Sequence, residues 1–175
     1  MAKMFDTRSL LGAEPTAKPT AKPSAKPSAK PLSGVAAGTR IMSMDGEIPV
    51  EFLEPGDRII TRDAGVVTLR ALTVTGLANQ PMIRVTADSL GFGRPGEDVL
   101  LAPGQTILLR DWRAKALYGQ AQAMVPVSRL VDGHYISHCT VASARIYGLR
   151  FDRRHVIYAA GLELASAPAL VPTPA

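Results

Sequence analysis

The sequence predicts an all-β, sandwich-like domain of many short strands with one or two short helical turns. Turn signals built from Gly, Pro and Asp recur at close intervals between Asp45 and Gly161. The segments between these turns are short and rich in Val, Ile, Leu and Thr, residues that favour strands. Many short strands joined by Gly- and Pro-containing turns are typical of β-sandwiches and barrels.

The turn signals divide this region into an ordered series of elements. A short helix is predicted at Asp111–Leu117, since Asp111 can cap it, and Ser128–Val131 is one helical turn at most. Pro49–Leu53 is ambiguous, although proline at its start suits a short helix. The predicted strands are Thr39–Met44, Arg58–Thr61, Val66–Thr75, Met82–Val85, Val99–Leu101, Thr106–Leu109, Tyr135–Tyr147 and Val156–Ala159.

A four-residue repeat precedes the predicted domain. Residues 16–31 read TAKPTAKPSAKPSAKP. Each proline fixes its own φ and keeps the preceding lysine extended, and the repeat has no apolar face to bury. We therefore predict an extended, polyproline-like spacer, with docking to an acidic partner or surface as the alternative.

The net charge of +5 belongs largely to this N-terminal part of the chain. Residues 1–32 hold six of the 20 Lys and Arg and two of the 15 Asp and Glu, so residues 33–175 hold fourteen and thirteen. A nucleic-acid-binding domain needs a basic face on its folded part, so we expect no nucleic-acid partner. A protein partner, bound through the domain or through the basic tail, is compatible with the sequence.

The predicted organisation is a disordered tail over residues 1–32, a β domain over 33–166 and a flexible end over 167–175. Cys139 is the only cysteine, so no internal disulfide forms and nothing indicates an oxidising compartment. The first thirteen residues lack the pattern of a secretory signal, and the chain has no run of about 18 apolar residues that would span a membrane. We expect a cytoplasmic protein, or one exported without a cleaved N-terminal signal.

An ordered set of motifs runs through the predicted domain. Residues 38–63 contain G-T-x-I, then D-G-x-x-P-V-E, L-x-P-G-D and T-x-D. Pro81–Val85, Leu100–Gln105 and Tyr147–Glu163 continue the series. The set resembles the Hedgehog/intein (Hint) domain, especially its bacterial type, over roughly residues 35–166. The resemblance implies a horseshoe-like all-β fold.

The resemblance also implies self-cleavage, in which a cysteine or serine at the start of the domain attacks the carbonyl of the preceding peptide bond. That acyl shift needs a nucleophile, a group that protonates the leaving amine, and donors for the oxyanion. The family's nucleophile lies four residues before the Gly-Thr. Gly34 holds that position here, and glycine has no side chain that could attack. Ser33 is the alternative nucleophile, but it lies one residue early, where a strand would turn its side chain to the other face.

Two further family positions are replaced, and two are kept. Gln105 stands where the family has a histidine, and an amide cannot transfer a proton near neutral pH. Ala102 stands where the family has a serine. Asp152 and His155 match the closing motif, so they are candidates for a catalytic or orienting pair. We favour the alternative in which Asp152 caps a turn and His155 is a partly buried histidine at a strand start.

The sequence predicts no cofactor and no metal site. The three histidines and Cys139 lack the paired spacing of zinc ligands. Strand alternation places Cys139 and His138 on opposite faces, so we interpret Cys139 as a buried, inert thiol. Gly91–Gly96 matches G-x-G-x-x-G, but it contains Pro95 and leads into a strand, so we interpret it as a loop.

Three functions stay open at the level of sequence. The favoured one is a degenerate Hint domain without catalysis that serves as a structural or interaction module. The second is an active autoprocessing domain that uses Ser33 or another nucleophile, and a fragment starting near Ser33 would reveal it. The third is an unrelated β binding domain with a different strand order. A Gly34→Cys variant is expected to recover some thiol-dependent cleavage, limited by Gln105.

Overall fold

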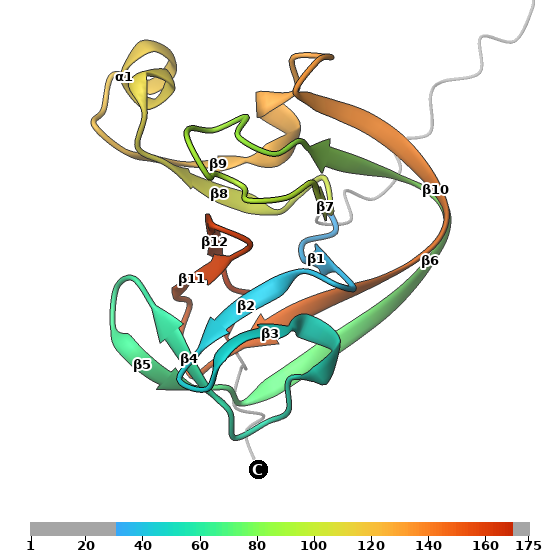
Figure 1. The fold of residues 1–175 in the computed structure, drawn as a ribbon, viewed down its shortest axis with the longest axis vertical. Helices are drawn as coiled ribbons and strands as arrows, with labels where there is room; N and C mark the ends of the chain where they lie inside the picture. The colour runs from blue at the N-terminus through green and yellow to red at the C-terminus, as the bar shows by residue number, and fades with distance from the viewer. Residues whose placement is uncertain (1–30, 170–175) are drawn as a thin grey trace, which may run out of the picture.

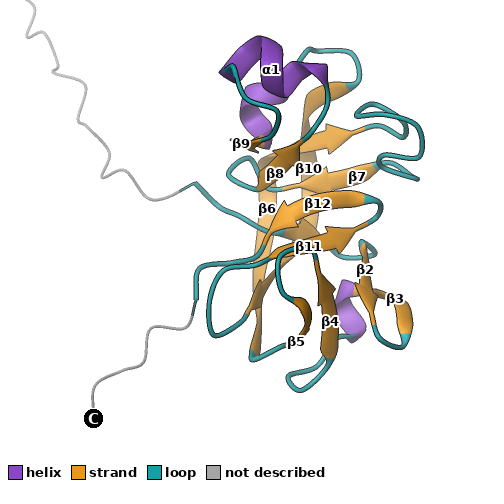
Figure 2. Cartoon of the chain, turned by 90° about the vertical axis from the view of Figure 1, so that its left-hand side faces the viewer, coloured by secondary structure: helices purple, strands orange, loops and turns teal. Residues whose placement is uncertain are grey.

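The computed structural model describes residues 31–169, so the predicted tail up to residue 30 and the last six residues lie outside that range. The described chain is built almost entirely from strands, as the sequence predicts (Figures 1 and 2). Its elements are β1 (Val35–Ala36), β2 (Arg40–Ser43), β3 (Gly46–Pro49), the 3-10 helix η1 (Val50–Phe52), β4 (Arg58–Thr61), β5 (Gly65–Thr68), β6 (Ala71–Val85), β7 (Val99–Leu101), β8 (Thr106–Leu109), α1 (Trp112–Tyr118), β9 (Ala123–Pro126), the 3-10 helix η2 (Val127–Leu130), β10 (Ile136–Arg150), β11 (Val156–Ala159) and β12 (Leu162–Ala165).

Two sheets share the core. Strands β1, β10, β6 and β7 close into a barrel, and the second sheet has the order β3-β2-β4-β11-β12-β8-β9, with β5 paired to β4. In Figure 1 the long strands β6 and β10 arch along one side of the molecule and join the upper group of β7, β8 and β9 to the lower group of β2 to β5. The horseshoe-like all-β architecture is thus confirmed.

The longest pairing joins β6 to β10 along fifteen residues each, from Ala71 opposite Arg150 to Val85 opposite Ile136. For β6 the sequence predicts two strands, Val66–Thr75 and Met82–Val85, with a break between Gly76 and Pro81. That division is wrong, because β6 continues through both residues. Gly76 and Pro81 both lie in an exposed part of β6. Proline has no N–H to donate across the pair, but at an exposed position water can bind the carbonyl that is left without this donor.

Strands β4, β7, β8 and β11 have the bounds that the sequence predicts, but the sequence does not predict four other short strands. The strands β1, β3, β9 and β12 are two to four residues long, and all four positions of β12 are buried, so it shows no alternation. The helical predictions fare better. Helix α1 starts directly after Asp111, whose carboxylate accepts the Arg113 N–H at 2.9 Å, and it ends at Gly119 in a left-handed conformation.

The core is aliphatic, as the low aromatic content requires. It fills the space between the two sheets, and its largest fully buried side chain is Phe151. A smaller cluster of Ala36, Met82, Ala102 and Ile146 lies where the N-terminal segment joins the barrel. Within residues 31–169, helices are too short and too polar to cross a membrane.

Candidate functional site

The junction between the N-terminal repeat and the barrel is held by main-chain hydrogen bonds. The carbonyl oxygen of Leu32 accepts the N–H of Gly104 at 2.9 Å, and the carbonyl of Gly34 accepts the N–H of Ala102 at 3.0 Å. A Cβ on Gly104 would lie 2.8 Å from the Leu32 oxygen, so the absence of a side chain permits this approach. The Leu32 carbonyl is therefore fixed and polarised by a donor.

Ser33 and Gln105, which the sequence singles out separately, meet at this junction. The Ser33 hydroxyl donates to Oε1 of Gln105 at 3.0 Å. The Gln105 amide nitrogen donates to the carbonyls of Ala165 at 2.8 Å and Thr106 at 3.1 Å. Because Gln105 is only 2% exposed and its amide is bonded at both ends, it links the segment before β1 to β8 and β12 as a structural group.

Gly34 occupies a position that no other residue fits. Its φ of +144° lies outside the range that L-residues favour. A Cβ there would stand 2.5 Å from the carbonyl oxygen of Tyr147 and 2.6 Å from Cγ2 of Ile146. A cysteine at this position would clash with the β10 backbone, so the restored cleavage expected for Gly34→Cys does not follow from this structure.

Ala102 adds no chemistry to the junction. Its methyl group is fully buried in the small cluster with Met82 and Ile146. Its N–H already binds the Gly34 carbonyl, so its contribution is packing and main-chain pairing.

The structure does not bring Asp152 and His155 together. Asp152 faces solvent and binds Arg70 at 2.9 Å, whereas the ring of buried His155 lies against Phe151. The partner of His155 is Asp63, whose Oδ2 lies 2.8 Å from His155 Nδ1. Asp63 belongs to the T-x-D motif, but the sequence does not predict its pairing with His155, because 92 residues separate the two.

Asp63 joins the loop after β4 to the start of β11. Its second oxygen accepts the N–H of Val156 at 2.9 Å. Burial pushes its pKa upward, but the bonds from Val156 and His155 outweigh that effect and bring the pKa below the ordinary value of 3.8. The carboxylate is ionised at neutral pH and favours the His155 tautomer that carries a proton on Nδ1. None of the side-chain hydrogen bonds of Ser33 reaches this dyad.

The remaining sequence candidates have no catalytic surroundings. Within residues 31–169, no three His, Cys, Asp or Glu side chains group as metal ligands would. Cys139 is half-buried, and its thiol lies 3.7 Å from the Met82 carbonyl across the strand pair. Gly91–Gly96 forms the loop before β7, so its glycine pattern opens no helix.

Chemically, the junction holds groups for two of the three requirements of an acyl shift, a nucleophile and an oxyanion donor, and lacks the group that transfers the proton. A hydroxyl lies at the first residue after the fixed Leu32 carbonyl, and one N–H polarises that carbonyl. The group that contacts the hydroxyl is an amide, which neither accepts its proton nor protonates a leaving amine.

Strand order and junction together define an intein-like fold, and solved structures agree. The bacterial intein-like domain from Clostridium thermocellum shares 14% identity and a TM-score of 0.53, covering 77% of this chain and 98% of its own. The DnaB intein from Synechocystis sp. PCC 6803 shares 10% identity and a TM-score of 0.54, covering 78% and 99%. The TvoVMA intein shares 13% identity and a TM-score of 0.53, covering 76% and 96%.

The family model of the Hint domain matches residues 34–169. This chain therefore belongs to the Hint domain family, and the alternative of an unrelated β domain is excluded. Comparison with curated protein sequences finds no match.

Proposed function

We propose that this Hint domain does not cleave its own chain and serves as a structural or interaction module. The observation that carries the proposal is the bond from the Ser33 hydroxyl to Gln105. Attack on the Leu32 carbonyl requires removal of the hydroxyl proton, and the Gln105 amide offers no base near neutral pH.

The leaving group meets the same obstacle. In an N-to-O shift the Leu32–Ser33 amide breaks as the ester forms, and the Ser33 nitrogen must gain a proton. The His155 imidazole is a proton carrier, but its Nδ1 is bound to Asp63 rather than to this nitrogen. The Gln105 amide already donates to Ala165 and Thr106.

The anchoring contacts support a structural role for the same residues. The junction carries a side-chain bond from Ser33 and main-chain bonds at Leu32 and Gly34. Each such bond contributes about 1 kcal/mol to stability. Together they hold the point at which the basic repeat of residues 16–31 enters the domain.

A second candidate is autoprocessing with Ser33 as nucleophile. The Gly104 N–H that binds the Leu32 carbonyl favours it, because one oxyanion donor is already in position. A mass-spectrometric comparison of wild type, Ser33→Ala, Ser33→Cys and Ser33→Cys/Gln105→His, each incubated with a thiol, separates the two functions.

The non-cleaving proposal predicts that the first three chains stay intact and that only the double variant releases a fragment ending at Leu32. Cysteine is more nucleophilic than serine, and the histidine supplies the proton transfer that the amide lacks. Cleavage of wild type that Ser33→Ala abolishes would establish the second candidate instead. Cleavage of Ser33→Cys at the rate of the double variant would show that Gln105 is not the block.

A further inference from the structure

One side of the second sheet carries several apolar side chains that are exposed or half-buried. Strand pairing puts Tyr158 opposite Glu163 and Val156 opposite Ala165. Their neighbour Ile157 is buried in the core between the sheets. Since successive side chains of a strand alternate, Val156 and Tyr158 point to the opposite, outward side. Figure 2 looks onto this side, with β8, β12, β11 and β4 in front of β6 and β10.

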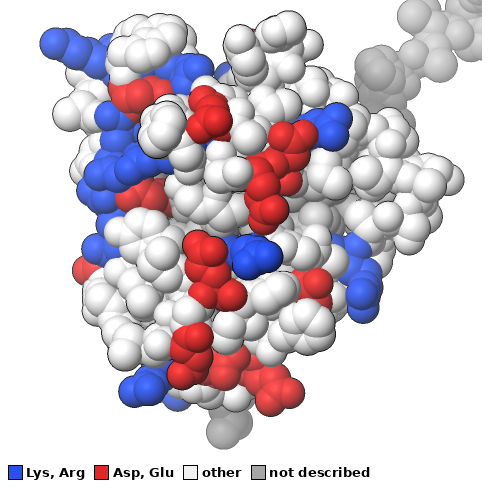
Figure 3. Space-filling model, viewed as in Figure 1, with Lys and Arg blue, Asp and Glu red and all other residues white. Residues whose placement is uncertain are grey.

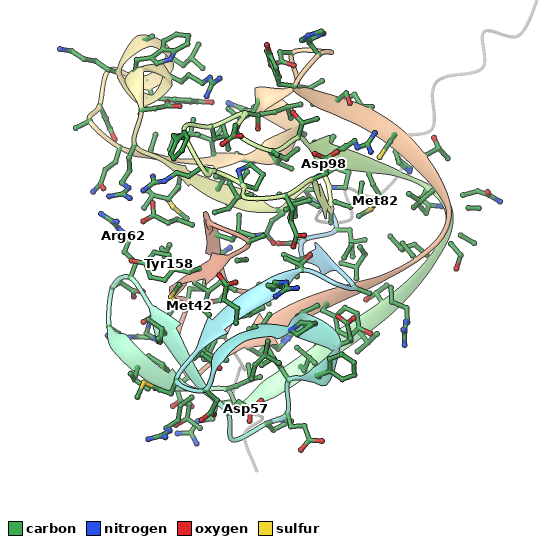
Figure 4. All side chains as sticks on the ribbon, in the orientation of Figure 1. Met42, Asp57, Arg62, Met82, Asp98 and Tyr158 are labelled. Carbon is green, nitrogen blue, oxygen red and sulfur yellow. The ribbon has the colours of Figure 1, made fainter. Side chains whose placement is uncertain are left out.

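Other strands contribute apolar side chains to the same side. Figure 4 shows Met42, Tyr158 and Arg62 projecting together from one side of the sheet. Solvent-facing sides of antiparallel sheets are normally polar, and a contiguous apolar patch marks an interaction site. We define the outer face by its apolar residues, which are Met42, Ile60, Val66, Leu108, Met124, Val156 and Tyr158.

One end of the outer face is hollowed. Met124, Val156 and Ala165 give the hollow an apolar wall, and Arg154 lies at its rim. Its volume of about 290 Å³ is enough for one large apolar side chain. Asp63 also lines it, but its carboxylate is bound to His155 and to the Val156 N–H. An anchoring side chain that fills a hollow at an interface is buried by the partner, which is where such side chains contribute most to affinity.

A cluster of two arginines and a glutamate lies among the apolar residues, centred on β12, the strand between β11 and β8. Arg62 and Arg110 each bind one oxygen of Glu163 at 2.7 Å, and Glu163 is 5% exposed. Two guanidinium groups against one carboxylate give this cluster a positive charge, and both arginine side chains are about 30% exposed, with further N–H donors toward solvent. The carboxylates of Asp63, in the hollow, and of Glu47, opposite Met42, lie on the same side and offset part of that charge. In Figure 3 the basic side chains gather along the left edge, the side onto which Figure 2 looks.

The charge of the outer face indicates which kind of partner could bind there. A second copy would bring the same arginines against these, and the repeat over residues 16–31 is itself basic, so neither complements the face. A nucleic acid would complement the arginines but would leave the apolar wall unfilled. An acidic polypeptide with one large apolar side chain satisfies both the charge and the hollow.

We propose that the outer face docks an acidic segment of a partner protein, with one large apolar side chain in the hollow beside Met124 and carboxylates on Arg62, Arg110 and Arg154. The inference rests on the proposed role as an interaction module. Thr106 and His155 also line the hollow. Peptide affinity and the mass of the chain are separate readouts, so either result can fail alone.

The test selects binders from a displayed library of random-sequence peptides with the full chain as target. The affinity of the recovered peptides is then measured for Arg154→Glu and Met124→Ser. Each variant has a matched control outside the hollow. Arg145→Glu makes the same charge change on the exposed arm of β10, and Met44→Ser removes a methionine that is 47% exposed against 45% for Met124.

The proposal predicts recovered peptides that carry Asp or Glu around one Leu, Phe or Met. Their affinity falls by about tenfold or more in Arg154→Glu and Met124→Ser and is unchanged in the controls. Urea unfolding of all four variants establishes that they are folded, and Arg154→Gln replaces any Arg154→Glu that is not.

Three results would overturn the proposal. The first is recovery of peptides without acidic residues, or of peptides that bind all variants equally. The second is tighter binding of a random-sequence single-stranded DNA that Met124→Ser leaves unchanged. The third is a dimer in light scattering that Met124→Ser dissociates, because the face would then be occupied by a second copy.

Discussion

At the scale of single residues, the close main-chain contacts of the junction depend on two glycines as much as on the side chains of Ser33 and Gln105. Gly104 lets its N–H reach the Leu32 carbonyl, and Gly34 lets the chain pass the Tyr147 carbonyl. The conformation of Gly34 and the close β10 backbone together leave no room for a side chain at this position. The sequence shows a glycine at position 34, but it does not show how close this glycine lies to the Tyr147 carbonyl.

Substitution of Gly34 by alanine should therefore destabilise the fold by about 3 kcal/mol, because it combines a clash with an unfavourable φ. Urea unfolding followed by circular dichroism measures the change. Gly38→Ala is the matched control, since Gly38 has a φ of +86° but no atom within 4 Å of an added Cβ. The control should lose only about 1 kcal/mol. Equal losses in the two variants would mean that the clash with Tyr147 has no effect.

At the scale of elements, strong local signals are predictable and long-range pairings are not. Asp111 marks the start of helix α1 in the sequence because capping is local chemistry. Strand β12 carries no such signal, since all its positions are buried. The pairing of Asp63 with His155 depends on β4 and β11 lying side by side, which the sequence of neither strand encodes.

Glu163 connects three of these elements, so its loss should weaken the second sheet. It lies on β12 and binds Arg62 after β4 and Arg110 after β8. Glu163→Ala leaves two guanidinium groups without their carboxylate and is expected to cost about 3 kcal/mol in the free energy of unfolding. Chemical denaturation compares it with Glu54→Ala, whose carboxylate makes no hydrogen bond or ion pair within the described residues. A loss below 1 kcal/mol would show that solvent already screens the cluster.

At the scale of the whole molecule, acid should release the link between the lower group of strands and β11. The pKa of Asp63 is lower in the folded chain than its ordinary value of 3.8, so the folded state is stabilised above that value. This contribution is lost as the pH falls through the folded pKa of Asp63, because the protonated carboxyl is a weaker acceptor for the hydrogen bonds from His155 and Val156.

Asp63→Asn tests this linkage through thermal unfolding at a series of pH values. The variant should be less stable than wild type near neutral pH by about 1 kcal/mol, a modest figure since the Asp63 side chain is 40% exposed. The difference should shrink as the pH falls below 3.8. Asp45→Asn, on an exposed turn, should follow wild type throughout. A gap between Asp63→Asn and wild type that stays constant with pH would contradict the linkage.

The family and its all-β architecture could be predicted from ordered motifs spread along the chain, because turn residues at fixed offsets determine local geometry. The state of the junction could be predicted only in part. The sequence shows that Gln105 replaces a histidine, but the bond from Ser33 to Gln105 depends on a contact across 72 residues. The outer face likewise depends on strand order, which places Met42, Tyr158 and Met124 on one side of a sheet.

The most direct test of the central claim is the intact mass of the full-length chain after prolonged incubation with hydroxylamine, which intercepts any ester formed at Ser33. Ser33→Ala serves as the reference. A single species with the mass of the whole chain is expected, identical in behaviour to the reference. A pair of fragments that separates Leu32 from Ser33, present in wild type and absent in the reference, would contradict the account.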